Sequence, residues 1–240
     1  MSAHQERTPP GHQATIPGRG LRLGRLFGIE IRLDSSLLII FTLIVYILGS
    51  SVFPQWHPDW PAGTTWMTAV IAGVLFFSSI LAHEMAHALV SRKFGIGVQQ
   101  ITLFLFGGLA EMEEEPGEPR AEFLIALAGP ATSMLLGLFF MLVGSLLAGA
   151  DSAALLADDR EAALAALSPM ATLLLWLGPV NLVLAIFNMV PGFPLDGGRV
   201  FRATIGFFTN YQIATKIAVN VGRLFAIGYI KGLREAVYAE

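Results

Sequence analysis

The sequence predicts an all-α polytopic membrane protein with about four to six transmembrane helices. Hydrophobic residues make up 54% of the 240-residue chain and charged residues only 14%, whereas a soluble domain carries about 25% charged residues. Four apolar segments approach the roughly 20 residues that a helix needs to cross a bilayer. They cover residues 35–53, 67–94, 122–147 and 170–190. The net charge of -3 gives no reason to expect nucleic acid as a partner.

The first part of the chain precedes the apolar segments. Residues 1–20 are rich in Pro, Gly, Gln and Arg, so we expect a disordered tail without a cleavable signal peptide. Residues 21–34 alternate apolar and polar side chains, which predicts a short strand at the membrane edge. We expect residues 21–240 to form one membrane domain.

The connections between the apolar segments carry weaker signals. Residues 95–108 alternate in part and are interrupted by glycine, which predicts a hairpin or re-entrant strand rather than a span. Residues 111–118 are acidic and predict a loop, and residues 151–169 predict a short surface helix. Residues 213–230 are apolar but interrupted by polar side chains, and are a weaker candidate for one more span.

The second apolar segment contains His83, Glu84 and His87 in the spacing His-Glu-x-x-His. Histidines four residues apart share one face of a helix and can bind one metal ion. In zinc peptidases with this spacing, the glutamate is the general base toward the attacking water. We prefer metal binding to a structural polar cluster, because an ionisable residue inside the membrane is costly and is functional by default.

A catalytic zinc site needs a third protein ligand and an open position. The chain has no cysteine, so the site must use histidines and carboxylates. The candidates for the third ligand are Asp196, Glu122, Glu111 and Glu30. Asp196 is favoured because Gly197 and Gly198 allow close backbone approach after the break at Pro191. The alternative is that Asp196 only caps the helix that begins there.

The distribution of Lys and Arg predicts the orientation. Residues 1–32 carry five arginines and residues 50–66 carry no Lys or Arg, which predicts a cytoplasmic N-terminus. The membrane that we expect is a plasma membrane. His83, His87 and Asp196 then lie at similar depth near the cytoplasmic side. Asn188, near the end of the fourth segment, is either a helix-packing amide or a donor to a developing oxyanion.

Three blocks of sequence resemble the site-2 protease family of intramembrane zinc metalloproteases, peptidase family M50. The first block is the His83 to His87 motif within an apolar segment. The others are Phe106-Gly107-Gly108 with Glu122-Phe123 and Ala128-Gly129-Pro130, and Asn188-Met189-Val190-Pro191 with Pro194-Leu195-Asp196-Gly197-Gly198-Arg199. They occur in the family's order and span most of the chain.

The resemblance implies one Zn2+ per chain, held by His83, His87 and Asp196, with Glu84 as general base and Asn188 at the active site. It implies regulated intramembrane proteolysis, with transmembrane proteins or peptides as substrates and the lipid bilayer as surroundings. It also implies a small membrane-associated β-sheet, to which a substrate pairs as an added strand near Leu103. Members similar to this chain continue with further membrane helices.

The competing hypothesis is a non-catalytic membrane transporter that handles a metal ion or protons. Transporters are often built from inverted repeats with paired broken helices, and this sequence has no internal repeat. A transporter also has no need of Glu84 directly after His83. A homologue that binds substrates without cutting them is disfavoured because His83, Glu84, His87 and Asp196 are all present.

Overall fold

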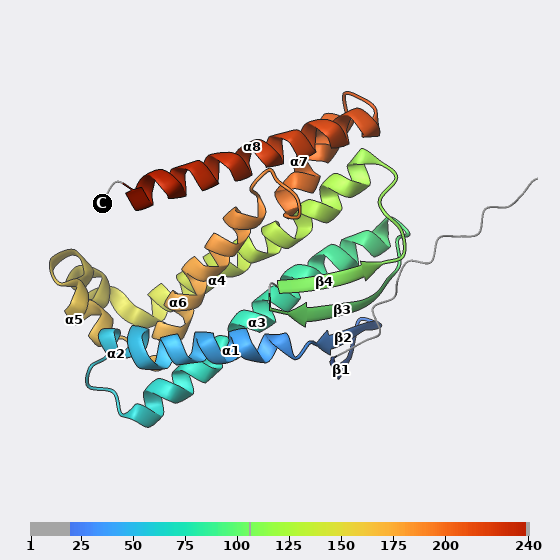
Figure 1. The fold of residues 1–240 in the computed structure, drawn as a ribbon. Coiled ribbons are helices and arrows are strands. Elements are labelled where there is room, and N and C mark those ends of the chain that lie inside the picture. Colours follow the sequence, from blue (N-terminus) through green and yellow to red (C-terminus); the bar gives the residue numbers. More distant parts are fainter. Residues whose placement is uncertain (1–19, 106, 239–240) are drawn as a thin grey trace, which may run out of the picture.

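The computed structural model describes residues 20–105 and 107–238 (Figure 1). Nearly all of the tail predicted for residues 1–20, and Phe106 of the second sequence block, lie outside the described residues. The helices are α1 (Ser36–Ile47), α2 (Phe53–Trp56), α3 (Ala62–Lys93), α4 (Pro119–Asp158), α5 (Arg160–Ala165), α6 (Pro169–Asn188), α7 (Asp196–Gly206) and α8 (Tyr211–Tyr238), and the π-helical turn η1 (Leu48–Val52) joins α1 to α2.

Four helical segments of the described chain are long and apolar enough to cross a membrane. They are Ser36–Trp56, Ala62–Lys93, Pro119–Gly149 and Pro169–Asn188, which confirms the four predicted spans to within a few residues. The weaker candidate at residues 213–230 lies in α8, which is not among these spans in the described part of the chain. Lys216, Asn220 and Arg223 interrupt its apolar residues.

A four-stranded sheet lies beside these helices, in the order β1 (Leu21–Leu26), β2 (Ile29–Leu33), β3 (Val98–Phe104) and β4 (Gly107–Met112). The β1–β2 and β3–β4 pairs are antiparallel, and β2 and β3 are parallel. The single strand predicted over residues 21–34 is therefore wrong. Phe27 and Gly28, with φ of 51° and 76°, turn the chain back on itself there, a conformation that glycine adopts without strain.

The acidic loop predicted to begin at Glu111 begins later, because Glu111 is paired in β4 with Gln100 of β3. The hairpin predicted for residues 95–108 is confirmed, with its second strand extended to Met112. The surface helix predicted for residues 151–169 corresponds to the last part of α4, which follows a break in the helix at Gly149 (φ 79°), together with α5. Asp159 separates the two and caps α5 by accepting from the Ala162 N–H at 3.0 Å.

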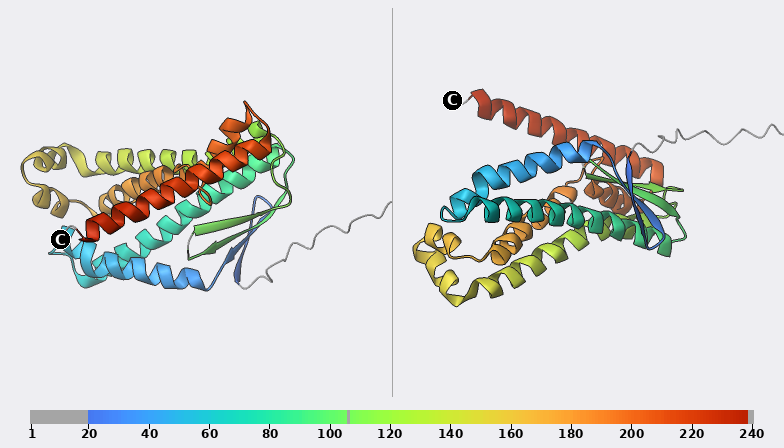
Figure 2. Two further views of the ribbon diagram at one scale, coloured as in Figure 1. Left: turned by 45° about the horizontal axis from the view of Figure 1, so that its top comes forward. Right: turned by 90° about the horizontal axis from the view of Figure 1, so that it is seen from below.

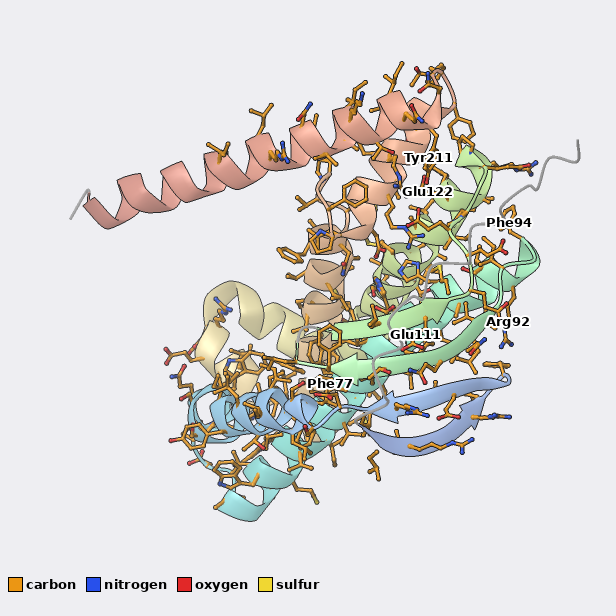
Figure 3. The ribbon with its side chains drawn as sticks, turned by 45° about the vertical axis from the view of Figure 1, so that its right-hand side comes forward. Phe77, Arg92, Phe94, Glu111, Glu122 and Tyr211 are labelled. Carbon is orange, nitrogen blue, oxygen red and sulfur yellow. The ribbon has the colours of Figure 1, made fainter. Side chains whose placement is uncertain are left out.

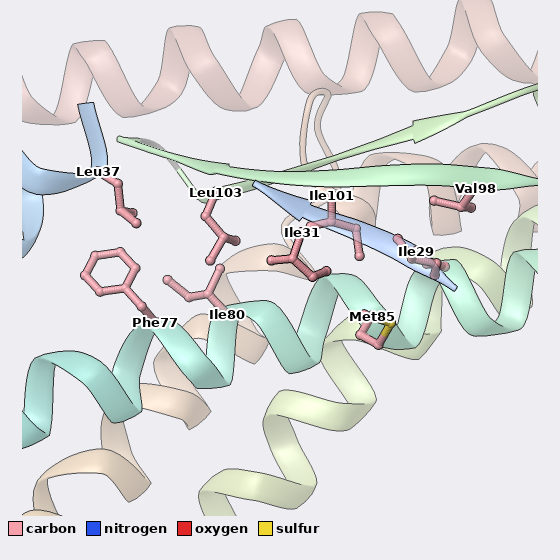
Figure 4. Packing of buried hydrophobic residues seen from close by; sticks show 10 residues of the cluster. Ile29, Ile31, Leu37, Phe77, Ile80, Met85, Val98, Ile101 and Leu103 are labelled. Carbon is pink, nitrogen blue, oxygen red and sulfur yellow. The ribbon is translucent and has the colours of Figure 1, made fainter. Parts of the chain in front are cut away.

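The sheet packs one apolar face on α3 (Figure 4). Ile29 and Ile31 of β2 and Ile101 of β3 are fully or almost fully buried there. The other buried members of this cluster include Leu37, Phe77, Ile80, Met85, Val98 and Leu103. Close packing of these apolar side chains fixes the sheet along the segment of α3 that carries the histidines.

On its other side α3 packs against α4 and α6 (Figures 1 and 2). Gly137 of α4 and Gly178 of α6 bring those two backbones together, because a Cβ at either glycine would lie close to the carbonyl oxygen of the other. Small residues of this kind let membrane helices approach closely. The sheet, α4 and α6 therefore surround the middle and end of α3.

Candidate active site

His83 and His87 of α3 point toward one carboxylate. The Nε2 atom of each histidine lies 3.1 Å from Oδ2 of Asp196, at the start of α7. Two ligand atoms on a tetrahedral zinc ion, each at about 2.0–2.1 Å from it, lie about 3.3 Å apart. Two imidazoles and a carboxylate are also donors that catalytic zinc sites use. The arrangement therefore fits Zn2+.

Contacts with α4 fix the orientation of both imidazole rings. The Nδ1 atom of His83 lies 2.9 Å from Oγ of Ser133, and Nδ1 of His87 donates to the carbonyl oxygen of Ile125 at 2.7 Å. Such contacts leave Nε2 for the metal and hold each ring in place. Sequence reasoning missed Ser133. Its only signal is a polar side chain within an apolar span.

Gly129 lets α4 pass directly beside the histidines. A Cβ at this position would overlap Nε2 of both His83 and His87. The second sequence block, Ala128-Gly129-Pro130, therefore has a physical basis, since any larger residue at 129 would occupy the place of the metal ion.

Asp196 reaches the histidines because α7 begins tightly against the end of α6. A Cβ at Gly197 would overlap the backbone of Met189, and one at Gly198 would overlap that of Gly192. The predicted close approach at these glycines is thus observed. Burial raises the pKa of Asp196, but the hydrogen bonds with His83 and His87 lower it by more, so its pKa lies below the ordinary value. The carboxylate is ionised, as a metal ligand must be.

Glu84 lies in the same cavity as the three candidate ligands. This cavity has a volume of about 620 Å3, and its lining includes His83, Glu84, His87, Asn188 and Asp196 together with apolar side chains from α1 and α3. Glu84 is half-buried. Its side chain passes next to Gly108 of β4, where a Cβ would overlap it. Gly108 therefore makes room for Glu84, which explains one glycine of the second sequence block.

Asn188 is the last residue of α6 and lines the same cavity. Its Nδ2 donates to the carbonyl oxygen of Leu184 at 2.9 Å, one turn back in the same helix. An amide group has two N–H donors, so one remains for another acceptor.

The other three carboxylates that were candidates for the third ligand lie elsewhere in the described structure. Glu122 is fully buried and pairs with Arg202. Glu111 accepts a hydrogen bond from Gln100 at 2.7 Å, and Glu30 pairs with Arg32 at 2.7 Å. Each has a cationic or amide partner of its own, and of the four only Asp196 is brought to the histidines.

Comparison with known proteins adds three findings. The family model for peptidase family M50 matches residues 71–229. A protein of Synechocystis sp., provisionally named a zinc metalloprotease, is 37% identical over 216 residues, which cover 87% of this chain and 52% of that protein. A zinc metalloprotease of Methanocaldococcus jannaschii is 30% identical over 209 residues, covering 86% of this chain and 52% of that protein.

A solved structure is also similar. The site-2 protease from Methanocaldococcus jannaschii superposes with a TM-score of 0.56 at 28% sequence identity, covering 92% of this chain and 87% of that one. The chain spans about half the length of the curated relatives it matches.

Proposed function

The chain belongs to peptidase family M50, and on that premise we propose that it is a zinc metalloendopeptidase of the membrane. Its reaction is hydrolysis of peptide bonds in or near transmembrane segments of membrane proteins, as a step of regulated intramembrane proteolysis. One observation carries the proposal. Glu84 shares a cavity with His83, His87 and Asp196, whose donor atoms lie within 4.8 Å of one another.

Each side chain has a separate task. His83, His87 and Asp196 hold the zinc ion, which when bound polarises a carbonyl group and makes water more acidic. Glu84 takes a proton from the attacking water and passes it to the leaving amine. The second N–H of Asn188 donates to the carbonyl oxygen as negative charge develops on it.

The edge of the sheet supplies a place for the substrate. A helical segment hides its carbonyl groups in internal hydrogen bonds, so it must unwind before cleavage. The sheet has β1 and β4 as its edge strands, and it is β4 whose Gly107, Gly108 and Leu109 line the cavity. Leu103 lies in β3, which is paired on both sides, so the added strand pairs with β4 instead.

The same site must admit water. Arg92 and Lys93 end α3, and their positive charge supports placing this end of α3 and the N-terminus on the cytoplasmic side of the membrane, which we propose is a plasma membrane. His83 lies ten residues before Lys93, about three helical turns from that end. The catalytic groups thus lie within reach of cytoplasmic water.

The experiment compares wild-type protein with Glu84→Gln in cells that express a membrane-anchored reporter. We expect cleavage by the wild type and none by Glu84→Gln, while Glu161→Gln, an exposed change on α5, cleaves normally. Equal cleavage by Glu84→Gln would overturn the role of Glu84. Zinc flux across vesicles without cleavage of any reporter would favour the transporter hypothesis instead.

A further inference from the structure

Arg199 places a positive charge in the cavity that holds the catalytic groups. It follows Asp196 by three residues on α7, so the two side chains lie on the same side of the helix. Gly197 and Gly198 lie between Asp196 and Arg199 in the sequence and face the backbone of residues 189–193, which follow α6. Arg199 therefore projects into the cavity, where its charge attracts the carboxylate of Glu84. Among the residues that line this cavity, no other is Lys or Arg.

Arg199 also lines a second cavity, which adjoins the first. This second cavity, of about 910 Å3, lies between β4 and the helices α7 and α8. Both cavities are lined by Leu109, Ala110 and Met112 of β4 and by Arg199. A chain that lies along β4 and crosses from one cavity to the other must therefore pass Arg199.

The guanidinium of Arg199 has no hydrogen bond or ion pair within the described part of the chain. Arg202, one turn further along α7, differs in this respect. It pairs with Glu122 and lies over the rings of Phe193 and Tyr211. The guanidinium of Arg199 therefore has no partner in the described chain that an incoming ligand must displace, and it can bind a ligand that offers a carboxylate or carbonyl oxygen.

We propose that Arg199 binds the carboxylate that peptide hydrolysis creates, an inference that rests on the proposed peptidase function. Hydrolysis breaks the C–N bond, and the water oxygen joins the carbonyl carbon. Glu84 carries the protons of this water to the departing amine, which leaves as an ammonium group, and Glu84 returns to its starting state. The N-terminal fragment then ends in a new carboxylate within the cavity. The planar guanidinium matches a carboxylate with two parallel hydrogen bonds, so Arg199 controls release of this fragment.

The test measures binding of two synthetic peptides to purified, zinc-loaded protein in detergent. Both are acetylated hydrophobic pentapeptides, one with a free C-terminal carboxylate and one with a C-terminal amide. We expect wild-type protein to bind the acid more tightly than the amide. In Arg199→Gln, we expect the ratio of the affinity for the acid to the affinity for the amide to fall about tenfold. Lys216→Gln, which removes an exposed positive charge on α8, keeps the full preference.

Arg199→Lys keeps the charge without the planar fork and retains only part of the preference for the acid. If Arg199→Gln fails to fold, Arg199→Lys tests the proposal in its place, and a full preference for the acid in Arg199→Lys would then overturn it. An Arg199→Gln protein that holds zinc and keeps the full preference overturns this proposal. Cleavage of the membrane reporter by the same wild-type preparation is measured in parallel. If the wild type does not cleave, the peptidase function fails. If the wild type cleaves and Arg199→Gln still prefers the acid, only the role of Arg199 fails.

Discussion

Arg202 on α7 donates its Nε–H to the carboxylate of Glu122 on α4 across 2.8 Å, although the two residues are 80 positions apart in the sequence. Glu122 is fully buried, and Tyr211 lies beside the pair (Figure 3). Burial and the neighbouring Glu122 carboxylate raise the pKa of Tyr211 to about 12, so its hydroxyl stays neutral. This ion pair ties α4, which supports the histidine rings, to α7, which carries Asp196.

Loss of one partner of this pair is expected to destabilise the protein strongly. Glu122→Ala leaves the charge of Arg202 buried without compensation, which costs about 3–5 kcal/mol. Thermal unfolding in detergent measures the loss. The double variant Glu122→Leu/Arg202→Met removes both charges and is expected to lose less. A single variant as stable as the wild type would show that the pair does not hold α7 to α4.

Ser133→Ala is expected to weaken zinc binding about 10- to 100-fold. The variant removes the hydroxyl that holds Nδ1 of His83, and leaves the three candidate ligands in place. Competition with a zinc-binding dye measures the affinity. The matched control is Thr132→Ala, because that hydroxyl bonds only to Ala128 of its own helix. Equal zinc affinities of the two variants would show that Ser133 does not support zinc binding.

Gly129→Ala is expected to abolish zinc binding without unfolding the protein. The added methyl group overlaps Nε2 of His83 and His87, whereas Ala is favoured over Gly within a helix by about 1 kcal/mol. Zinc content and thermal unfolding are measured on the same sample. Gly63→Ala on α3, where a Cβ meets nothing within 4 Å, is the control and keeps its zinc. A zinc-loaded Gly129→Ala protein contradicts the proposed metal position.

Stability is expected to fall as the pH drops below about 6.5, in part through His57. This imidazole is buried, stacks on Trp60 and lies 2.8 Å from Oγ1 of Thr172. Burial lowers the pKa of His57, and the nearby backbone of Ala165 opposes this shift only in part. The unfolded chain therefore binds the proton first, and the contribution of His57, complete above pH 6.5, is lost on acidification.

The variant His57→Gln tests this pH dependence. Thermal unfolding is compared at pH 7.5 and pH 5.5, and the variant is expected to lose less stability on acidification than the wild type. An equal loss in both proteins would assign the acid sensitivity to other groups.

The spans could be predicted from the sequence because each is a long apolar run with polar ends. The pairing of side chains between spans could not be predicted in the same way. Glu122 was a candidate ligand because nothing local marks Arg202 as its partner. Ser133 and Gly129 act on the histidines only because α4 packs on α3.

The strands were predicted less well for a local reason. Alternation over residues 21–34 continues through Phe27, so the pattern hides the turn. Gly28 was the available signal for it. Asp196 could be favoured beforehand because Gly197 and Gly198 follow it, although its distance from the histidines depends on how α6 and α7 pack.

Zinc content and cleavage, measured together on purified protein, test the central claim most directly. The account predicts one zinc ion per chain in wild-type protein and in Glu84→Gln, with cleavage only by the wild type. It predicts that Asp196→Ala loses both zinc and cleavage. Full zinc content and cleavage by Asp196→Ala would contradict the site formed by His83, His87 and Asp196.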